Sequence, residues 1–191
     1  PRLKNPSTET ILYFVRKGVH HPDGVKRIMT SAASQGSHSV AQAFAQFWQI
    51  DNQVQFAHDW RTFCHDEAFR IPADVDAVFV VKDMAEHEAL WATERLSADG
   101  FQLTSPDIGA HATTLDYLQR TEIPPGYLGQ DPPLPDQLIV TYSVATYLVA
   151  RPGLTPRLLA AAAHLLDRDS NTLAVRGFEP TLADTADVLQ G

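Results

Sequence analysis

The residues best suited to chemistry lie in the turn from Ser31 to His38, SAASQGSH. Gly36 has no Cβ, so the backbone can approach a ligand closely, and Ser34 or Ser37 is placed to cap a helix that starts there. The first amides of such a helix lack intrahelical partners and carry the positive end of its dipole. The turn is therefore a candidate cradle for a carboxylate or phosphate, although most turns of this composition are only capped helix starts.

Histidine is the next residue type to consider, because the chain has eight. The densest set of potential metal ligands combines His58 and His65 with Asp59, Asp66 and Glu67. The two histidines are seven residues apart and form no HExxH or comparable pair. We interpret this set as a solvated helix face and predict no metal site.

Nucleophilic catalysis has little support in the sequence. Cys64 lies on the apolar side of its predicted helix, where a buried structural thiol is the usual outcome. The motifs GxSxG, P-loop and GxGxxG are all absent. We predict no catalytic residue and no cofactor. Lys82, at the end of the most apolar run, is a cation expected at the same rim as the Gly36 turn, where it can pair with an acidic ligand or remain a surface lysine.

The elements that position these residues alternate between strand and helix patterns. Strands are predicted over 10–16, 25–30, 53–57, 75–81, 101–104 and 138–150, and helices over a segment ending at 48 and over 59–69, 84–98, 106–120 and 156–166. The proline-rich segment 123–135 is expected to be an irregular loop. The run 75–81 is apolar on both faces, as in a covered central strand. The pattern predicts an α/β fold, a three-layer sandwich with a largely parallel sheet, in which ligands bind at the carboxyl ends of the strands.

Composition narrows the classes of partner. The 191 residues carry a net charge of -8, which argues against nucleic acid as the main partner. No apolar run reaches the roughly 20 residues needed to span a bilayer, and no signal peptide opens the chain. The chain begins at Pro1 rather than methionine, so we expect a processed or excised piece without its targeting segment.

Three stretches, taken in order, resemble the TAXI family of solute receptors that serve TRAP transporters. They are the Ser/Gly turn, the strand DAVFVV of 76–81, and the segment IPPGYLGQDPPLPDQLIVTYSVATYLVA of 123–150, followed by Arg151. The family's corresponding stretches look like GppGSGTR, DAffvv, and IPaGtYpGqd with a later run ending in LvaR. The resemblance covers nearly the whole chain but only the later part of the family.

The resemblance implies one lobe of a type II periplasmic binding protein, with a first lobe missing. Its expected divisions are a polar tail or linker at 1–9, a ligand-binding lobe at 10–167 and a polar extension at 168–191. It implies a non-catalytic receptor, periplasmic or extracytoplasmic with or without a membrane tether, that captures a small anionic solute such as an amino acid or dicarboxylate for membrane transporter subunits. The residues expected to bind this ligand are Ser34, Gln35, Gly36, Ser37, His38, Lys82 and Tyr127.

The turn also departs from the family pattern, since Gln35 replaces the serine before glycine and His38 replaces arginine. Losing arginine removes a fixed charge and a bidentate fork for carboxylates, and His38 supplies part of that charge only when protonated. Two other hypotheses remain open. One is an effector-sensing regulatory domain of the same architecture, and the other is a hydrolase or metal enzyme that uses His58, His65 and Asp66.

Overall fold

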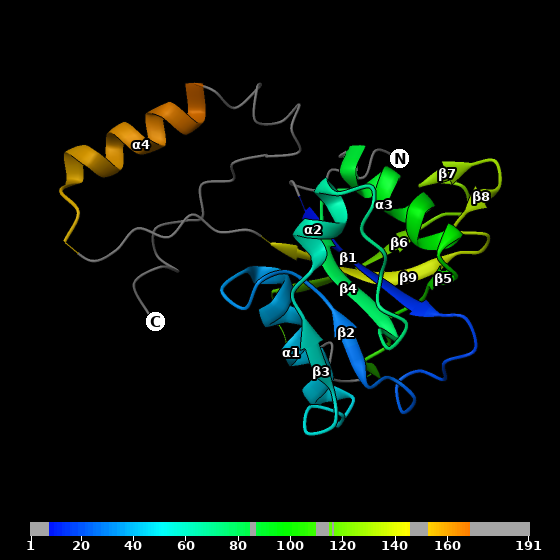
Figure 1. Ribbon diagram of the computed structural model, residues 1–191. Helices are drawn as coiled ribbons and strands as arrows, with labels where there is room; N and C mark the ends of the chain where they lie inside the picture. Colours follow the sequence, from blue (N-terminus) through cyan, green and yellow to red (C-terminus); the bar gives the residue numbers. More distant parts are fainter. Residues whose placement is uncertain (1–7, 85–86, 110–114, 116, 146–152, 169–191) are drawn as a thin grey trace. The chain divides into compact units, whose positions relative to one another are not determined.

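The computed structural model describes residues 8–84, 87–109, 115, 117–145 and 153–168 (Figure 1). The chain forms two compact units, Glu9–Val144 and a second made of Pro1–Thr8 with Ala145–Gly191. The lobe expected over 10–167 thus corresponds to the first unit only up to Val144. The described part of the second unit contains helix α4 (Pro156–Arg168), with proline in its first turn as the sequence predicts.

The described part of the larger unit alternates between strands and helices as predicted. Its strands are β1 (Thr8–Arg16), β2 (Arg27–Met29), β3 (Gln55–Ala57), β4 (Ala77–Lys82), β5 (Phe101–Leu103), β6 (Leu118–Ile123), β7 (Gly129–Gln130), β8 (Pro133–Leu134) and β9 (Ile139–Ala145). Its helices are α1 (Gly36–Phe47), α2 (Trp60–His65) and α3 (His87–Ala98).

The central sheet is mixed rather than largely parallel. Its strand order is β3-β2-β4-β1-β9-β6, and β5 also pairs with β1. Strand β2 pairs in parallel with β3 and β4, whereas β1 is antiparallel to β4 and β5, and β6 is antiparallel to β9. The prediction of parallel pairing holds for β3, β2 and β4, because α1 and α2 form the crossovers between them.

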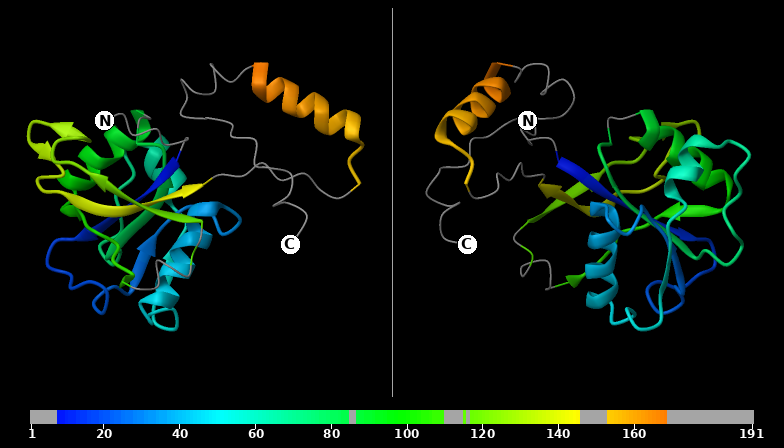
Figure 2. Two further views of the ribbon diagram at one scale, coloured as in Figure 1. Left: turned by 180° about the vertical axis from the view of Figure 1, so that it is seen from behind. Right: turned by 60° about the vertical axis from the view of Figure 1, so that its left-hand side comes forward.

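Helices cover both faces of this sheet, which makes the larger unit a three-layer α/β sandwich (Figures 1 and 2). Side chains alternate along the central strands, so that Tyr13 and Phe79 join the cluster under α1 while Phe14 and Val80 join the cluster under α2 and α3. Both clusters consist of nearly solvent-free residues. Two buried faces explain why the β4 sequence is apolar at every position from 77 to 81.

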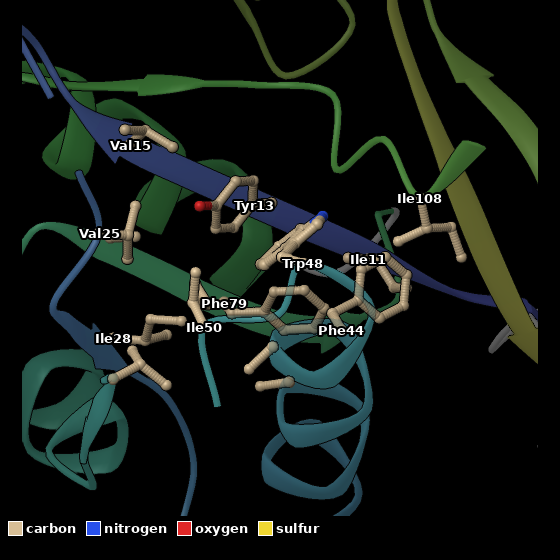
Figure 3. Packing of buried hydrophobic residues seen from close by; sticks show 14 of the residues in the cluster. Ile11, Tyr13, Val15, Val25, Ile28, Phe44, Trp48, Ile50, Phe79 and Ile108 are labelled. Carbon is tan, nitrogen blue, oxygen red and sulfur yellow. The ribbon is translucent and has the colours of Figure 1, made fainter. Parts of the chain in front are cut away.

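Aromatic rings fill the centre of the cluster under α1 (Figure 3). The ring of Phe79 lies 5.2 Å from that of Phe44, 5.8 Å from Tyr13 and 6.4 Å from Trp48, measured between centroids. Trp48 also donates its indole N–H to the carbonyl of Asp107 at 2.8 Å. These contacts hold α1 against β4 and so fix where the start of α1 lies.

Two predictions about the later part of the chain are wrong. The helix expected over 106–120 does not extend through Arg120, because Leu118–Ile123 is strand β6, paired along its length with β9. The middle of that expected helix, 110–114 and 116, lies outside the described residues. The segment 123–135 is not wholly irregular, since β7 and β8 pair within it. In both cases backbone pairing with a partner strand outweighs a weak local pattern.

Arg95 of α3 anchors α2 and the loop that follows it. Its guanidinium lies 4.4 Å above the Phe63 ring and donates hydrogen bonds to the carbonyls of Phe63 at 2.7 Å and of Phe69. The carbonyl groups after a short helix have few intrahelical partners, so one planar donor can satisfy several of them. This arrangement fixes α2, which carries Trp60 at its start.

Candidate anion-binding site at the carboxyl ends of the parallel strands

The carboxyl ends of β2, β3 and β4 lie at one edge of the sheet, because the three strands run in the same direction. The segment after β2 leads into α1, the one after β3 leads into α2, and the one after β4 leads toward α3. Ligands of open α/β sheets bind at such an edge. The turn that the sequence singled out is therefore in a position suited to ligand binding.

Helix α1 begins without a side-chain cap. Gln35 is the N-cap residue, in an extended conformation, and its side chain makes no capping hydrogen bond. The prediction that Ser34 or Ser37 caps the helix is wrong, since the Ser37 hydroxyl instead accepts a hydrogen bond from the Val81 N–H at 3.1 Å. The first turn of α1 contains no acidic residue, so neither a cap nor a carboxylate offsets the positive end of the helix dipole.

The first residues of α1 and the turn before it differ in exposure. Ser34, Gln35 and Gly36 are exposed, Ser37 is half-buried and His38 is buried. An added Cβ at Gly36 would meet no heavy atom within 4 Å. The backbone at Gly36 is therefore open to a ligand from solvent, and His38 forms an inner wall.

Four buried side-chain atoms lack a hydrogen-bond partner among the residues that the structure describes. They are Thr30 Oγ1, Ser31 Oγ, His38 Nδ1 and Trp60 Nε1, on side chains of 0%, 6%, 7% and 6% exposure. All four belong to the first turn of α1 or to the residues that follow β2 and β3. Leaving a buried polar group unpaired costs about 1–3 kcal/mol, so each of these groups requires an explanation. Trp60 packs in the cluster under α2 and α3, in the layer opposite α1, so a polar ligand at the start of α1 would supply partners only for the other three.

His38 and His58 form a pair at this edge. Their ring centroids are 4.9 Å apart in an edge-to-face arrangement, and the His38 ring packs at the same distance against Phe56. His58 Nδ1 lies 2.7 Å from the carbonyl oxygen of Ser31. Because a carbonyl only accepts, Nδ1 of His58 carries hydrogen and its Nε2 remains available to a ligand or a proton. Burial lowers the pKa of His38, and the charge of His58 lowers it further.

Lys82 ends β4 as predicted, but its charge is balanced. Its Nζ lies 2.6 Å from Glu88 Oε1 on α3, and the Cys64 thiol donates to the same oxygen at 3.5 Å. Burial alone raises the pKa of Glu88, but the hydrogen bond and charge of Lys82 outweigh that effect and lower it. A solute that pairs with Lys82 must therefore compete with Glu88.

Replacing Glu88 by glutamine should make Cys64 more reactive. Burial and the adjacent Glu88 carboxylate raise the pKa of Cys64 to about 12. Without that negative charge, Lys82 and Arg95 favour the thiolate, so we expect labelling by a thiol reagent at pH 8 to accelerate at least threefold, since one pKa unit changes the thiolate fraction by about tenfold. The matched control is Glu94→Gln on the exposed side of α3, which should label at the original rate. Equal rates for the two variants would contradict this account.

Tyr127 is separate from the other predicted ligand residues. It lies in the loop between β6 and β7, is 49% exposed, and donates its amide to the Pro124 carbonyl at 3.2 Å. The next residue, Leu128, belongs to the cluster under α3, in the layer opposite α1. Within the described ranges, no interaction joins Tyr127 to the turn of 31–38. The structure therefore brings together Gln35, Gly36, Ser37 and His38, with Lys82 next to the Ser37 contact.

Sequence reasoning gave no role to the Thr30 side chain, and it considered His58 only as a metal ligand. A signal existed for His58, because it directly follows the predicted strand 53–57. Thr30 is the last residue of the predicted strand 25–30, so listing polar side chains after the strands would have missed it. The burial of the Thr30 side chain, however, could not be read from the sequence.

Two hollows in the larger unit lie away from this edge. One, of about 250 Å³, is lined by Phe14, Thr93, Leu103 and the proline-rich loop. The other, of about 590 Å³, is lined by residues that include Ser105, Arg120 and Tyr142. Neither includes a residue of the 30–38 segment. The candidate site is thus an open edge with polar walls, and an opposing surface would be needed to enclose a ligand there.

Comparisons with protein-family models and with curated proteins give no match for this chain. The class that the structure defines is a mixed α/β protein with helices on both faces of its sheet. Among the residues described, no three histidine, cysteine, aspartate or glutamate side chains are grouped to hold a metal ion. Within those same ranges, no helix combines the length and apolar character that crossing a membrane requires.

Proposed function

We propose that this chain is the ligand-binding lobe of a TAXI-type solute receptor and captures a small anionic solute at the start of α1. The carrying observation is the set of unpaired buried polar atoms on Thr30, Ser31 and His38, at the end of β2 and the start of α1. Hydroxyl groups and the first helix amides can all donate hydrogen bonds, and donors at the positive end of a helix favour an anion. A carboxylate is the simplest group of this chemistry.

The geometry also supports binding rather than catalysis. The described groups at the edge offer donors and a histidine pair, but Cys64 is held as a thiol and Lys82 is paired with Glu88. No nucleophile with an adjacent general base lies at the start of α1 within the described residues. Amides at Gly36 and Ser37 would hold the carboxylate, with His38 beneath it and Gln35 at the rim.

The remaining parts of the proposal come from the resemblance. They are a first lobe that encloses the ligand, a membrane transporter as the receiving partner, and an extracytoplasmic location. The openness of the site fits a first lobe, because an exposed edge leaves one side of a bound solute in water. A type II architecture closes that side with the opposite lobe.

Isothermal titration calorimetry tests the proposal directly. The full-length gene product, including any residues encoded before Pro1, is titrated with L-glutamate, succinate and sulfate, and with L-glutamine as a control that lacks the side-chain charge. We expect at least one of the acids to bind at micromolar to submillimolar Kd and the control to bind at least tenfold more weakly. Absence of heat with all three acids would contradict an anion receptor.

A further inference from the structure

We propose that solute capture at this site is coupled to proton uptake by His38, so that the anion binds as a histidinium ion pair. This inference rests on the proposed function, since it concerns the same site. It goes beyond the proposed function by assigning a proton as the second species that the site takes up. The basis for the proton uptake is the buried position of His38 in the structure, not only its place in the sequence.

His38 lies at the candidate site, and none of the described residues stabilises a positive charge on it in the free protein. It is 7% exposed, its Nδ1 has no partner among the described residues, and its ring packs on Phe56. As the third residue of α1 it also lies at the positive end of the helix dipole. A proton on His38 is therefore disfavoured by burial, by the helix and by the neighbouring His58.

Among the residues that the structure describes, no carboxylate forms an ion pair with His38, and Asp83, which follows β4, is not among the groups that shift its pKa. Helix α1 contains no other ionisable side chain, and Thr30 and Ser31 after β2 are uncharged. The residues that follow β3 contribute His58 and Asp59, of which only His58 affects the titration of His38.

The positive charge at the end of β4 is already paired. Lys82 ends that strand with its charge balanced by Glu88. Within the described ranges, no acidic side chain pairs with His38, so a bound anionic ligand would be its counter-ion.

A bound anion would reverse the balance that disfavours a proton on His38. A carboxylate within about 4–6 Å of an imidazolium raises the histidine pKa by about 1–3 units. The free protein then holds His38 neutral near pH 7, while the complex holds it protonated. Because ligand binding and proton binding strengthen each other to the same extent, affinity must rise as the pH falls from the pKa of the complex toward that of the free protein.

His58 helps to define the surroundings of His38. Its Nδ1–H is directed to the Ser31 carbonyl, and its ring centroid lies 4.9 Å from that of His38. We therefore expect uptake of a single proton, on His38.

Calorimetry with sulfate and with L-glutamate between pH 5.5 and 8.5 tests the coupling, since the charge of each acid group is constant over that range. We expect Kd to increase at least tenfold from pH 5.5 to pH 8.5. At pH 6.5, titrations in buffers of different ionisation enthalpy should show net uptake of a substantial fraction of one proton. His38→Gln should remove both the uptake and the pH dependence, leaving an affinity like that of the wild type at pH 8.5.

Two further measurements separate this role from a structural one. His38→Asn serves as a second uncharged variant if glutamine unfolds the protein. His87→Gln, at the exposed start of α3, is the matched control and should keep the wild-type pH dependence. Nuclear magnetic resonance of the histidine rings should show the His38 pKa rising by at least one unit when sulfate is added.

The outcomes are distinguishable. If the acids bind equally tightly at every pH, or if His38→Gln retains the proton uptake, the coupling is overturned while the receptor function stands. If no acid binds at any pH, the proposed function is overturned and the coupling with it. A pH-dependent affinity that follows His38 and not His87 supports the coupling.

Discussion

Replacing Phe79 by alanine is expected to lower the free energy of unfolding by about 3–5 kcal/mol, the usual loss for truncating a buried phenylalanine. Phe79 is fully buried at the middle of β4, and its ring lies among those of Tyr13, Phe44 and Trp48 (Figure 3). These neighbours come from different elements and are themselves tightly packed, so the cavity cannot close by a small shift. Because a domain is stable by only about 5–15 kcal/mol, this loss is a large fraction of the total stability.

Urea unfolding followed by tryptophan fluorescence and by circular dichroism measures this loss. The matched control is Phe47→Ala on α1, which removes the same ring from the same cluster at a half-buried position. We expect Phe47→Ala to lose less than half as much as Phe79→Ala. Equal losses would mean that the centre of the cluster is not organised around β4.

Gly36→Asp is expected to weaken anion binding at least tenfold while leaving the protein as stable as before or slightly more stable. The backbone at Gly36 is not in the left-handed region and an added Cβ meets nothing within 4 Å, so the substitution fits. A carboxylate in the first turn of a helix is favourable by about 0.3–1 kcal/mol. The same carboxylate occupies the amides of Gly36 and Ser37, where the proposed ligand binds, and repels its charge.

This test separates loss of binding from loss of folding, because Gly36→Asp should weaken anion binding without lowering the stability of the protein. Thermal unfolding gives the change in stability, and calorimetry with the tightest-binding acid gives the change in affinity. Gly36→Ala is the matched control, because it adds the Cβ without the charge and should keep the affinity within about threefold. An unchanged affinity in Gly36→Asp would place the ligand elsewhere on the protein.

Local pattern was sufficient for the elements that position the site. The alternating strands and helices, the doubly buried β4 and the apolar face of α1 follow from side-chain periodicity. The sequence also located the turn of 31–38 at the carboxyl end of a strand, and the structure places it there. Gly100 takes the left-handed conformation expected for the end of α3, with φ of 85°.

Only the tertiary structure showed in which direction each strand runs. β1 and β9 are apolar and β-rich, a pattern that is the same in parallel and antiparallel sheets, so the mixed sheet was not predictable from composition. The pairing of Leu118–Ile123 with β9 likewise depends on a contact between segments about 20 residues apart. Such pairing is a property of the assembled sheet, and it overrode the expected helix.

The chemistry of the site was likewise determined partly by the sequence and partly by the tertiary structure. By itself the sequence determined which residue types stand at the turn, including the glycine that leaves the backbone open and the histidine two residues after it. Only the tertiary structure decided their partners: Ser37 bonds to Val81 instead of capping α1, and Lys82 pairs with Glu88. Burial and hydrogen bonding depend on residues distant in the chain, so the unpaired atoms around His38 exist only in the folded protein.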